Sequence, residues 1–181
     1  MIKFKRIFMD PGHGGEDSGT YNSTIKAKES DVALKVAKEV RKLFTSKKRK
    51  FKFSRKIDKK VELNSRWRKA RDWNADLVLC IHCNSWKDKS VRGTEVWHYG
   101  ENDKHLAEVL SSKISKSLGV PNRGRKEHGF AMTYYPTMPA VLIEIDFISN
   151  DDFAKQCKKK EYIKQIAKAI YDGVRAVENE K

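Results

Sequence analysis

The chain has few cysteines, with three among 181 residues: Cys80, Cys83 and Cys157. An odd number of thiols at irregular spacing offers no disulfide framework. Cys80 and Cys83 flank His82, but there is no second Cys-x-x-Cys pair to complete a zinc finger, and Cys157 is distant. We therefore expect three buried, unreactive thiols in a protein that folds in a reducing compartment.

Long apolar runs are also absent. No stretch approaches the roughly 20 apolar residues that a membrane-spanning helix needs. Residues 1–6 (M-I-K-F-K-R) lack the apolar core of a secretory signal peptide. The sequence thus predicts no membrane insertion and predicts synthesis in the cytoplasm.

The four prolines and ten glycines are too scattered to form a linker. No internal repeat or low-complexity segment divides the chain either. A length of 181 residues with 39% hydrophobic content is sufficient for one core. We expect residues 1–181 to form a single domain.

Acidic residues are outnumbered by basic ones, 24 to 39, and the net charge is +15. The excess lies mainly in residues 1–75, and basic clusters occur at 47–50, 59–60 and 158–160. Such a charge attracts polyanions such as nucleic acid, anionic membrane or anionic wall polymer, although a solvated surface explains it equally well. Aromatic residues do not alternate with the basic clusters as a nucleic-acid stacking surface requires, so we expect no nucleic-acid partner.

The most informative segment is D-P-G-H-G-G at residues 10–15. It follows the apolar run Ile7–Met9, which predicts a strand, and one proline with three glycines predicts a turn where that strand ends. Because glycine has no Cβ, the backbone can pass close to whatever the imidazole of His13 holds. A histidine placed this way is suited to metal binding or proton transfer.

Three more segments place a reactive side chain at the end of a predicted element. Glu29 begins a helical pattern, His82 closes one apolar run, and Glu144 lies near the end of another. In an open α/β sheet the carboxyl ends of the strands converge on one crevice. Two histidines and one carboxylate form a common catalytic zinc set, and a further carboxylate can transfer protons.

Two other carboxylates compete for these roles. Glu16 lies in the same turn as His13, but the start of a helix gives Glu29 a more fixed geometry. Asp146 is two residues beyond Glu144 and shares its face of the strand, so Asp146 is an alternative base.

Apolar periodicity indicates an α/β fold. It predicts helices over 29–45, 61–74, 103–118 and 161–177, strands over 3–9, 51–53, 77–82, 93–99 and 140–145, and a polar loop over 119–129. Leu63, Trp67 and Ala70 are expected on the inner face of the second helix. Strands that alternate with helices imply a largely parallel, mixed sheet, and the continuous run 140–145 predicts a central strand.

Several motifs occur in a characteristic order. They are D-P-G-H-G-G at 10–15, E-S-D-V-A-L-K at 29–35, S-R-K-I-D at 54–58, L-N-S-R-W-R-K-A at 63–70, A-D-L-V-L-C-I-H-C-N at 75–84, G-T-E-V-W at 93–97, N-R-G at 122–124 and P-A-V-L-I-E-I-D-F-I-S-N at 139–150. With them the chain resembles the zinc-dependent N-acetylmuramoyl-L-alanine amidases of the amidase-3 family, which includes phage endolysins and bacterial autolysins. The resemblance implies one catalytic domain, a three-layer sandwich whose sheet of about six strands has helices on both faces.

The resemblance also implies the role of each site residue. His13, Glu29 and His82 would bind Zn²⁺, and Glu144 would be the catalytic carboxylate. Cys80 and Cys83 stand where the family tends to have Ser and Ala, and Asp146 where Gly is common. None of these departures removes a ligand or the base.

The implied reaction is hydrolysis of the amide bond between the lactyl group of N-acetylmuramic acid and the L-alanine of the stem peptide, in the peptidoglycan of an anionic Gram-positive wall. A zinc peptidase that cuts within the stem peptide or cross-bridge would use the same residues. A basic wall- or nucleic-acid-binding module with a structural metal is a third possibility.

Three residues are candidates for substrate binding. Arg123 and Arg125 lie in the predicted polar loop, where they could hold the carboxylates of a stem peptide through bidentate hydrogen bonds. Asn84 follows His82 closely and is expected to support the site or contact the substrate. Without a signal peptide, the enzyme would act on the wall after release, during phage lysis or when a mother cell breaks open.

Overall fold

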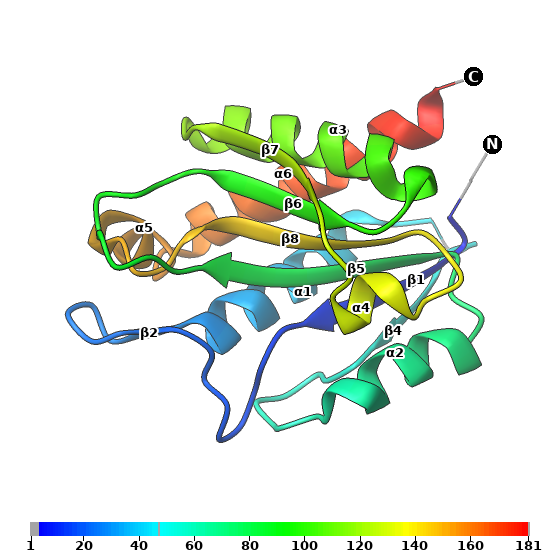
Figure 1. Ribbon diagram of the computed structural model, residues 1–181, viewed down its shortest axis with the longest axis horizontal. Helices are drawn as coiled ribbons and strands as arrows, with labels where there is room; N and C mark the ends of the chain where they lie inside the picture. Colours follow the sequence, from blue (N-terminus) through cyan, green and yellow to red (C-terminus); the bar gives the residue numbers. More distant parts are fainter. Residues whose placement is uncertain (1–3, 47, 181) are drawn as a thin grey trace.

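The computed structural model describes residues 4–46 and 48–180, which form a sheet with helices on both faces (Figure 1). The start of the predicted first strand and Lys47 of the first basic cluster lie outside the described residues. The strands are β1 (Arg6–Pro11), β2 (Tyr21–Asn22), β3 (Ala27–Lys28), β4 (Lys50–Phe53), β5 (Leu77–Asn84), β6 (Thr94–His98), β7 (Asn122–Glu127) and β8 (Ala140–Phe147). The helices are α1 (Glu29–Leu43), α2 (Leu63–Asp72), α3 (Glu101–Leu118), α4 (Ala131–Tyr134), α5 (Asp151–Gln156) and α6 (Lys160–Asn179).

The main sheet has six strands in the order β4-β1-β5-β8-β6-β7. Strands β4, β1, β5 and β8 are parallel, whereas β6 runs antiparallel to β8 and parallel to β7. Strands β2 and β3 form a separate antiparallel ribbon before α1. The predicted α/β fold with a mostly parallel, mixed sheet of six strands is confirmed.

The larger part of the core lies between the sheet and the helices α1, α3 and α6. Helix α1 contributes Val32, Val36 and Val40, spaced four residues apart, and all three are buried. Helix α6 contributes a similar stripe from Ile163 to Val177. These stripes confirm the predicted periodicity, because a helix buries residues that recur every three or four positions.

Helices α2 and α4 cover part of the opposite face and enclose a smaller apolar cluster around Phe8, Val78 and Cys80. Here one prediction was wrong: Leu63, expected to face inward, is 56% exposed. Arg66 takes the buried position on α2 instead. One of the positions of α2 that face the sheet therefore carries a charge, and the partners of this charge lie in the functional site.

The predicted polar loop 119–129 is also corrected, since Asn122–Glu127 forms the edge strand β7 beside β6. Its side chains are almost all exposed. An edge strand pairs along one side only and is commonly protected from aggregation by charged side chains. The segment N-R-G-R-K-E therefore carries no apolar alternation that would mark it as a strand.

All three cysteines are free and buried, as expected. Cys80 packs into the smaller cluster and Cys83 into the larger core, so the two side chains point to opposite faces of β5. Burial raises the pKa of both thiols well above the ordinary value. Neither is suited to act as a thiolate nucleophile.

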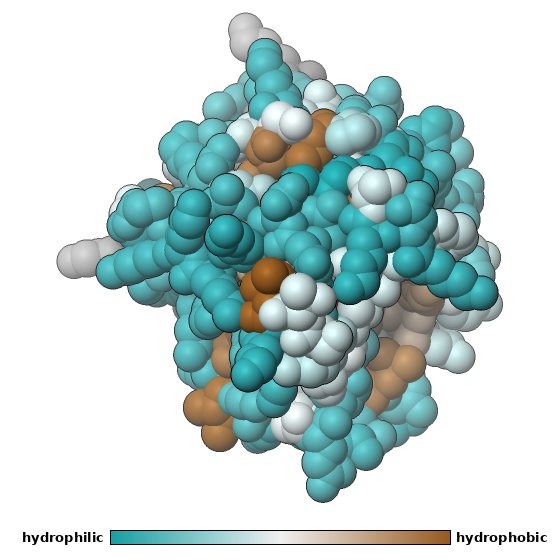
Figure 2. Space-filling model, turned by 90° about the vertical axis from the view of Figure 1, so that its left-hand side faces the viewer, coloured by the Kyte–Doolittle hydropathy of each residue, from teal (hydrophilic) through white to brown (hydrophobic). Residues whose placement is uncertain are grey.

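Figure 2 shows the face of the molecule that lies on the left in Figure 1. This face is mainly hydrophilic and carries small, separate apolar patches. Within the part of the chain that the structure describes, no helix has the length and apolar character needed to cross a bilayer.

Glu178 connects the two ends of the described chain through a hydrogen bond with Phe4, and it forms a buried ion pair with Arg49. Glu178, in the last turn of α6, accepts hydrogen bonds from a guanidinium nitrogen of Arg49 at 2.6 Å and from the backbone N–H of Phe4 at 3.1 Å. Arg175 donates a third at 2.7 Å. Burial opposes the charge on Glu178, but these bonds hold the pKa of its carboxyl below the ordinary value of 4.5.

We expect Glu178→Ala to lower the free energy of unfolding at pH 7 by about 3 kcal/mol, because Arg49 remains buried without its partner. A carboxylate with a depressed pKa stabilises the fold above its ordinary pKa, and this contribution is lost as the pH falls through the lower, folded value. The difference from wild type should therefore shrink below about pH 4. Urea unfolding at pH 7 and pH 3.5 measures it.

The matched control is Glu161→Ala, which removes an exposed carboxylate paired with Lys164 on the same helix. Its effect should stay within about 0.5 kcal/mol at both pH values. Equal losses in the two variants would contradict the assigned role of Glu178.

Candidate functional site

Four of the predicted site residues meet at the carboxyl ends of the parallel strands. His13 follows β1 on a turn with a φ of 57°, and Glu29 is the first residue of α1. His82 and Glu144 lie directly opposite each other on β5 and β8. Side chains opposite each other in register share one face of a sheet, so His82 and Glu144 both point toward the turn.

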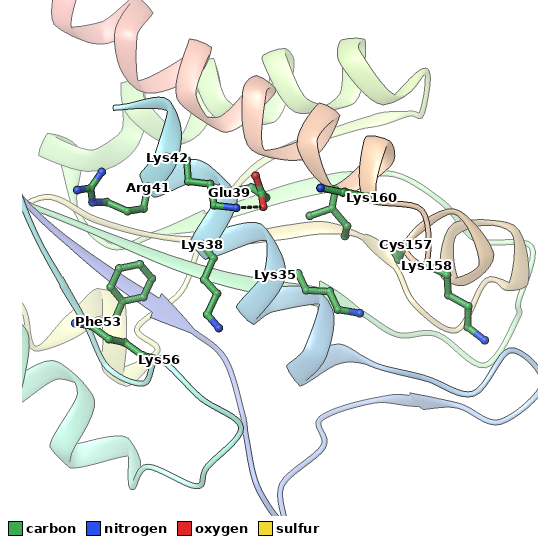
Figure 3. A pocket seen from close by; sticks show the side chains of 11 residues that line it. Lys35, Lys38, Glu39, Arg41, Lys42, Phe53, Lys56, Cys157, Lys158 and Lys160 are labelled. Atoms are coloured by element: carbon green, nitrogen blue, oxygen red, sulfur yellow. Dashed lines mark hydrogen bonds and ion pairs between the residues drawn. The ribbon is translucent and has the colours of Figure 1, made fainter. Parts of the chain in front are cut away.

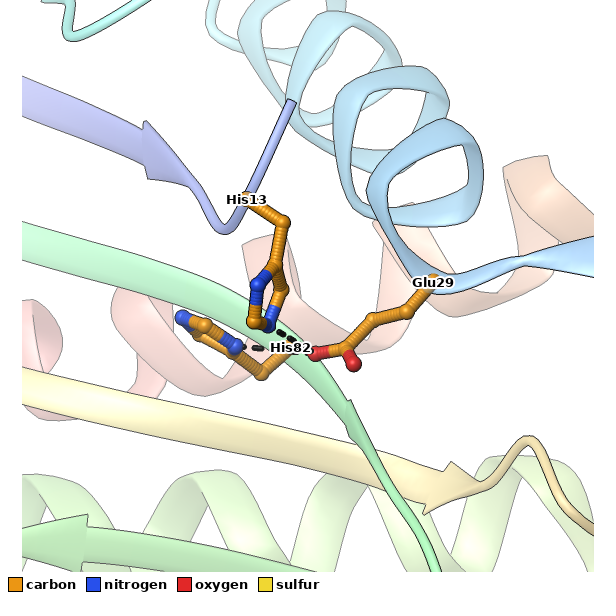
Figure 4. A group of neighbouring side chains, drawn as sticks. All are labelled: His13, Glu29 and His82. Carbon is orange, nitrogen blue, oxygen red and sulfur yellow. Dashed lines mark hydrogen bonds and ion pairs between the residues drawn. The ribbon is translucent and has the colours of Figure 1, made fainter. Parts of the chain in front are cut away.

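Three of the four present donor atoms to a common point (Figure 4). An oxygen of Glu29, Oε1, lies 3.1 Å from Nε2 of His13 and 2.9 Å from Nδ1 of His82. Zinc bonds of about 2.0–2.1 Å separate tetrahedral donors by about 3.3 Å, so a slight increase in these two distances would suit the ion. The donor set therefore has the composition and spacing of a metal site, and no thiol of the described residues belongs to it.

Glu29 is fixed as a carboxylate by its surroundings. Its Oε2 accepts a hydrogen bond from the backbone N–H of Thr20 at 2.9 Å, and its Oε1 accepts one from Cys83 at 3.2 Å. Burial opposes the charge, but the hydrogen bonds with His13 and His82 hold the pKa of Glu29 far below the ordinary value. A buried anion facing two imidazoles makes the centre attractive to a cation.

Asp17 orients His13 from outside the cluster. Both carboxylate oxygens of Asp17 lie 2.9 Å from Nδ1 of His13, so the other ring nitrogen, Nε2, faces Glu29. Burial opposes a charge on His13, but Glu29 and then Asp17 raise the pKa of its imidazole to about 9. Asp17 had no predicted role: Glu16 was the carboxylate considered in this turn, and no pattern in the sequence distinguishes the two.

Two glycines leave room for the donors. A Cβ on Gly12 would collide with the imidazole of His82, and one on Gly19 would collide with the carboxylate of Glu29. Gly19 also has a φ of +62°, which favours glycine. The glycines around His13 thus allow close approach, as the sequence predicted, although Gly12 makes room for His82 rather than for His13.

Two buried arginines donate hydrogen bonds to the backbone of the turn that carries His13. Arg55 donates to the carbonyl oxygens of Pro11 at 3.1 Å and Gly12 at 2.7 Å. Arg66 donates to the carbonyl oxygens of Pro11 at 2.9 Å and His13 at 2.7 Å. Asp10, itself buried, pairs with Arg66 at 2.9 Å. Both arginines lie in motifs that carried the family resemblance, but no role was predicted for either.

Glu144 lies beside the donor group of His13, Glu29 and His82 but is not part of it. Its Oε2 is buried and has no hydrogen-bond partner among the described residues. Burial raises the pKa of Glu144 to about 7; His82 opposes this rise, and the charges of Glu29 and Glu95 add to it. A carboxyl that gains and loses a proton near neutral pH suits general base and acid chemistry.

The rival carboxylates are paired with other groups or lie outside the donor cluster. Asp146 is fully buried and accepts hydrogen bonds from Arg92 at 2.6 Å and from the backbone N–H of Gly93 at 2.8 Å. These contacts leave it tied to the loop before β6. Glu16 is exposed and lies outside the donor cluster.

A cleft of about 500 Å³ gives access to the site. Its polar lining includes His13, His82 and Glu144. Leu63 and Phe130, both exposed, lie along its apolar side. The exposure of Leu63 therefore places an apolar side chain where a substrate can contact it.

The three candidate substrate-binding residues are not together. Asn84 and Arg123 line a separate hollow next to the cleft, where both contact Glu95, the register neighbour of Glu144. Arg125 lies 3.8 Å from Glu108 of α3, on the other side of the sheet. Roles in substrate binding stay predictions for all three residues.

The chain matches the amidase-3 family, described as N-acetylmuramoyl-L-alanine amidase, over residues 7–176. The chain belongs to this family. It is 33% identical over 97% of its length to the probable cell wall amidase LytH of Staphylococcus saprophyticus, and 37% identical over 92% to the N-acetylmuramoyl-L-alanine amidase LytC of Bacillus subtilis. It spans 59% of LytH and 34% of LytC.

The fold matches solved amidase structures. An N-acetylmuramoyl-L-alanine amidase from Clostridium difficile 630 aligns over 99% of both chains with a TM-score of 0.92 and 32% identity. The resemblance inferred from the motifs is thereby confirmed for nearly the whole chain.

We expect Asp17→Asn to weaken metal binding about 10- to 100-fold, because the carboxylate that orients His13 and raises its basicity is lost. Asp17 is 53% exposed, so folding should be little affected. Competition with a chromophoric chelator measures the affinity for Zn²⁺, and circular dichroism verifies the fold.

Glu16→Gln is the matched control, since it removes a neighbouring exposed charge that makes no contact with the cluster. It should leave the zinc affinity unchanged. A tenfold loss in Glu16→Gln with none in Asp17→Asn would reverse the assignment.

Proposed function

We propose that this chain is a zinc-dependent N-acetylmuramoyl-L-alanine amidase. It would hydrolyse the amide bond between the lactyl group of N-acetylmuramic acid and the L-alanine of the stem peptide. The observation that carries the proposal is the donor triad of His13, Glu29 and His82, with Glu144 opposite His82 on the next strand. Membership of the amidase-3 family supports the choice of bond.

Zinc is the ion that best fits this donor set. Two imidazoles and one carboxylate are a common catalytic zinc set, and three protein ligands leave one position open. A bound Zn²⁺ would polarise the scissile carbonyl and make water more acidic. Nε2 of His13, Nδ1 of His82 and Oε1 of Glu29 would hold the ion, and Asp17 would keep His13 in the required tautomer.

Glu144 would carry the proton in both halves of the reaction. As a carboxylate it would accept a proton from the attacking water, and as a carboxylic acid it would donate that proton to the nitrogen of the leaving L-alanine. A pKa of about 7 allows both forms near neutral pH. Oε2 of Glu144 is buried and has no hydrogen-bond partner among the described residues, so no bond to another residue competes for the proton there.

The substrate would lie along the cleft between α2 and the segment that contains α4. Leu63 and Phe130 offer apolar contact there, and the neighbouring hollow presents Asn84 and Arg123 to polar groups of the stem peptide. Arg125 lies near Glu108 of α3, away from this hollow, and its contact with the stem peptide stays a prediction. The site of action would be the peptidoglycan of an anionic wall, reached after release from the cell that made the protein.

The test is digestion of purified Gram-positive peptidoglycan by the zinc-loaded protein, with and without a chelator. Release of peptides that begin with L-alanine, stopped by the chelator and restored by Zn²⁺, would support the proposal. New amino termini at other residues would replace it with a peptidase. The absence of any product from several wall types would overturn the enzymatic assignment.

We expect Glu144→Gln to lower the rate of amide hydrolysis about 10²- to 10⁴-fold, because the amide side chain neither accepts nor donates the proton. The rate of appearance of new L-alanine termini measures this, with zinc content determined on the same sample.

Zinc content and fold should match wild type in Glu144→Gln, since Glu144 is outside the donor triad. Glu16→Gln, which removes an exposed carboxylate from the turn that carries His13, should retain full activity. A zinc-loaded Glu144→Gln protein with the wild-type rate would refute the assigned mechanism.

A further inference from the structure

A second hollow lies away from the cleft. It is lined by α1, by the end of β4 with the residues that follow it, and by the connection between α5 and α6 with the start of α6. Its volume is about 550 Å³, slightly larger than that of the cleft. Phe53, Cys157 and Ile163 provide its apolar surface. Among the described residues that line the two cavities, none is shared.

Basic side chains surround this hollow, which we call the basic groove (Figure 3). Its cationic lining residues come from three separate segments of the chain: Lys35, Lys38, Arg41, Lys42, Lys56, Lys158 and Lys160. Among the described residues, Glu39 is the single carboxylate in the lining, and it pairs with Lys42. The groove therefore carries a large excess of positive charge.

Most of this charge has no internal partner. Five of the lining lysines form no ion pair with a carboxylate of the described residues at a distance of 4.0 Å or less: Lys35, Lys38, Lys56, Lys158 and Lys160. Elsewhere on the helices, lysines are paired: Lys164 with Glu161 and Lys168 with Asp172. Gathering like charges without acids costs free energy, so an anionic ligand would stabilise this arrangement.

We propose that the basic groove binds a linear polyanion with repeated phosphodiester groups, an anionic polymer of the cell wall. The choice of a wall polymer rests on the proposed function, which places the chain at the wall. Lys35, Lys38 and Lys42 lie three and four residues apart on one face of α1, and a rise of 1.5 Å per residue spreads them over about 10 Å. A row of charges of that length suits a polymer with repeated anions better than a single phosphate.

The groove lacks the features that favour nucleic acid. Proteins that bind single strands stack bases on aromatic rings along a basic channel. Among the described lining residues, Phe53 is the single aromatic, and it is half-buried at the end of β4. The apolar surface and the lysine stems instead suit the short carbon backbone between phosphates in a polymer without bases.

The position of the groove separates binding from hydrolysis. A polymer held there would leave the cleft open, so the catalytic domain could stay on the wall while the cleft engages successive stem peptides. Retention at the surface raises the local concentration of substrate without any change in the chemical step.

The test measures the affinity of the wild-type chain and of two triple variants for soluble poly(glycerol phosphate) at several salt concentrations. The first variant replaces Lys35, Lys38 and Lys158 by glutamine. We expect at least a tenfold loss of affinity at 0.1 M salt, and a plot of log affinity against log salt that is shallower by about 2. The matched control replaces Lys113, Lys116 and Lys126 by glutamine, which are exposed and line neither cavity.

Equal weakening in the two triple variants would overturn the proposal, because overall charge and not the groove would then determine binding. Tighter binding of single-stranded DNA or of anionic vesicles than of the polymer would also overturn it, in favour of those partners. The polymer contains no stem peptide, so its binding is independent of the proposed hydrolysis. Cleavage of a small soluble muropeptide should be the same in wild type and both variants.

Discussion

Two buried guanidinium groups hold the backbone of the turn that carries His13, and the rest of the site depends on them. The carbonyl oxygens of residues 11–13 leave the sheet and point into the protein, where each needs a donor. Arg55 and Arg66 supply these donors, because a guanidinium offers several N–H groups in a fixed fork. The acidic partner Asp10 makes the burial of Arg66 tolerable. The turn can therefore keep a positive φ at His13 and present Nε2 to Glu29.

The second constraint is the register of the sheet. His82, Glu144 and Glu95 lie opposite one another on β5, β8 and β6, so a candidate metal ligand, the proposed proton carrier and a second carboxylate form one row. Because β8 is central, the carboxyl of Glu144 is largely removed from water, which raises its pKa. The same burial that stabilises the sheet thus gives Glu144 the raised pKa that the proposed proton transfer requires.

Charge is organised on two separate surfaces. In the cleft, carboxylates and imidazoles face one another at short distances and create a centre that attracts a cation. In the basic groove, seven cationic side chains surround a single carboxylate of the described lining, Glu39, and the proposed ligand is an anion. LytH and LytC extend beyond the region that aligns with this chain, whereas the basic groove lies within it. In the proposal, catalysis and retention at the wall are therefore properties of the same fold.

The sequence alone determined the α/β class, the apolar stripes of α1 and α6, the central place of β8 and the four residues that meet at the strand ends. These features are local: periodicity reports burial, and a polar residue at the end of an apolar run marks a strand end. Tertiary structure decided the edge strand β7, the exchange of Leu63 for Arg66 on the buried side of α2, the bond from Asp17 to His13, and the separation of Glu144 from Asp146. It also assembled the basic groove from three distant segments. Each of these features depends on contacts that the local sequence does not reveal. Strand pairing and charge compensation are set by which groups lie close together in space, and not by their order in the chain.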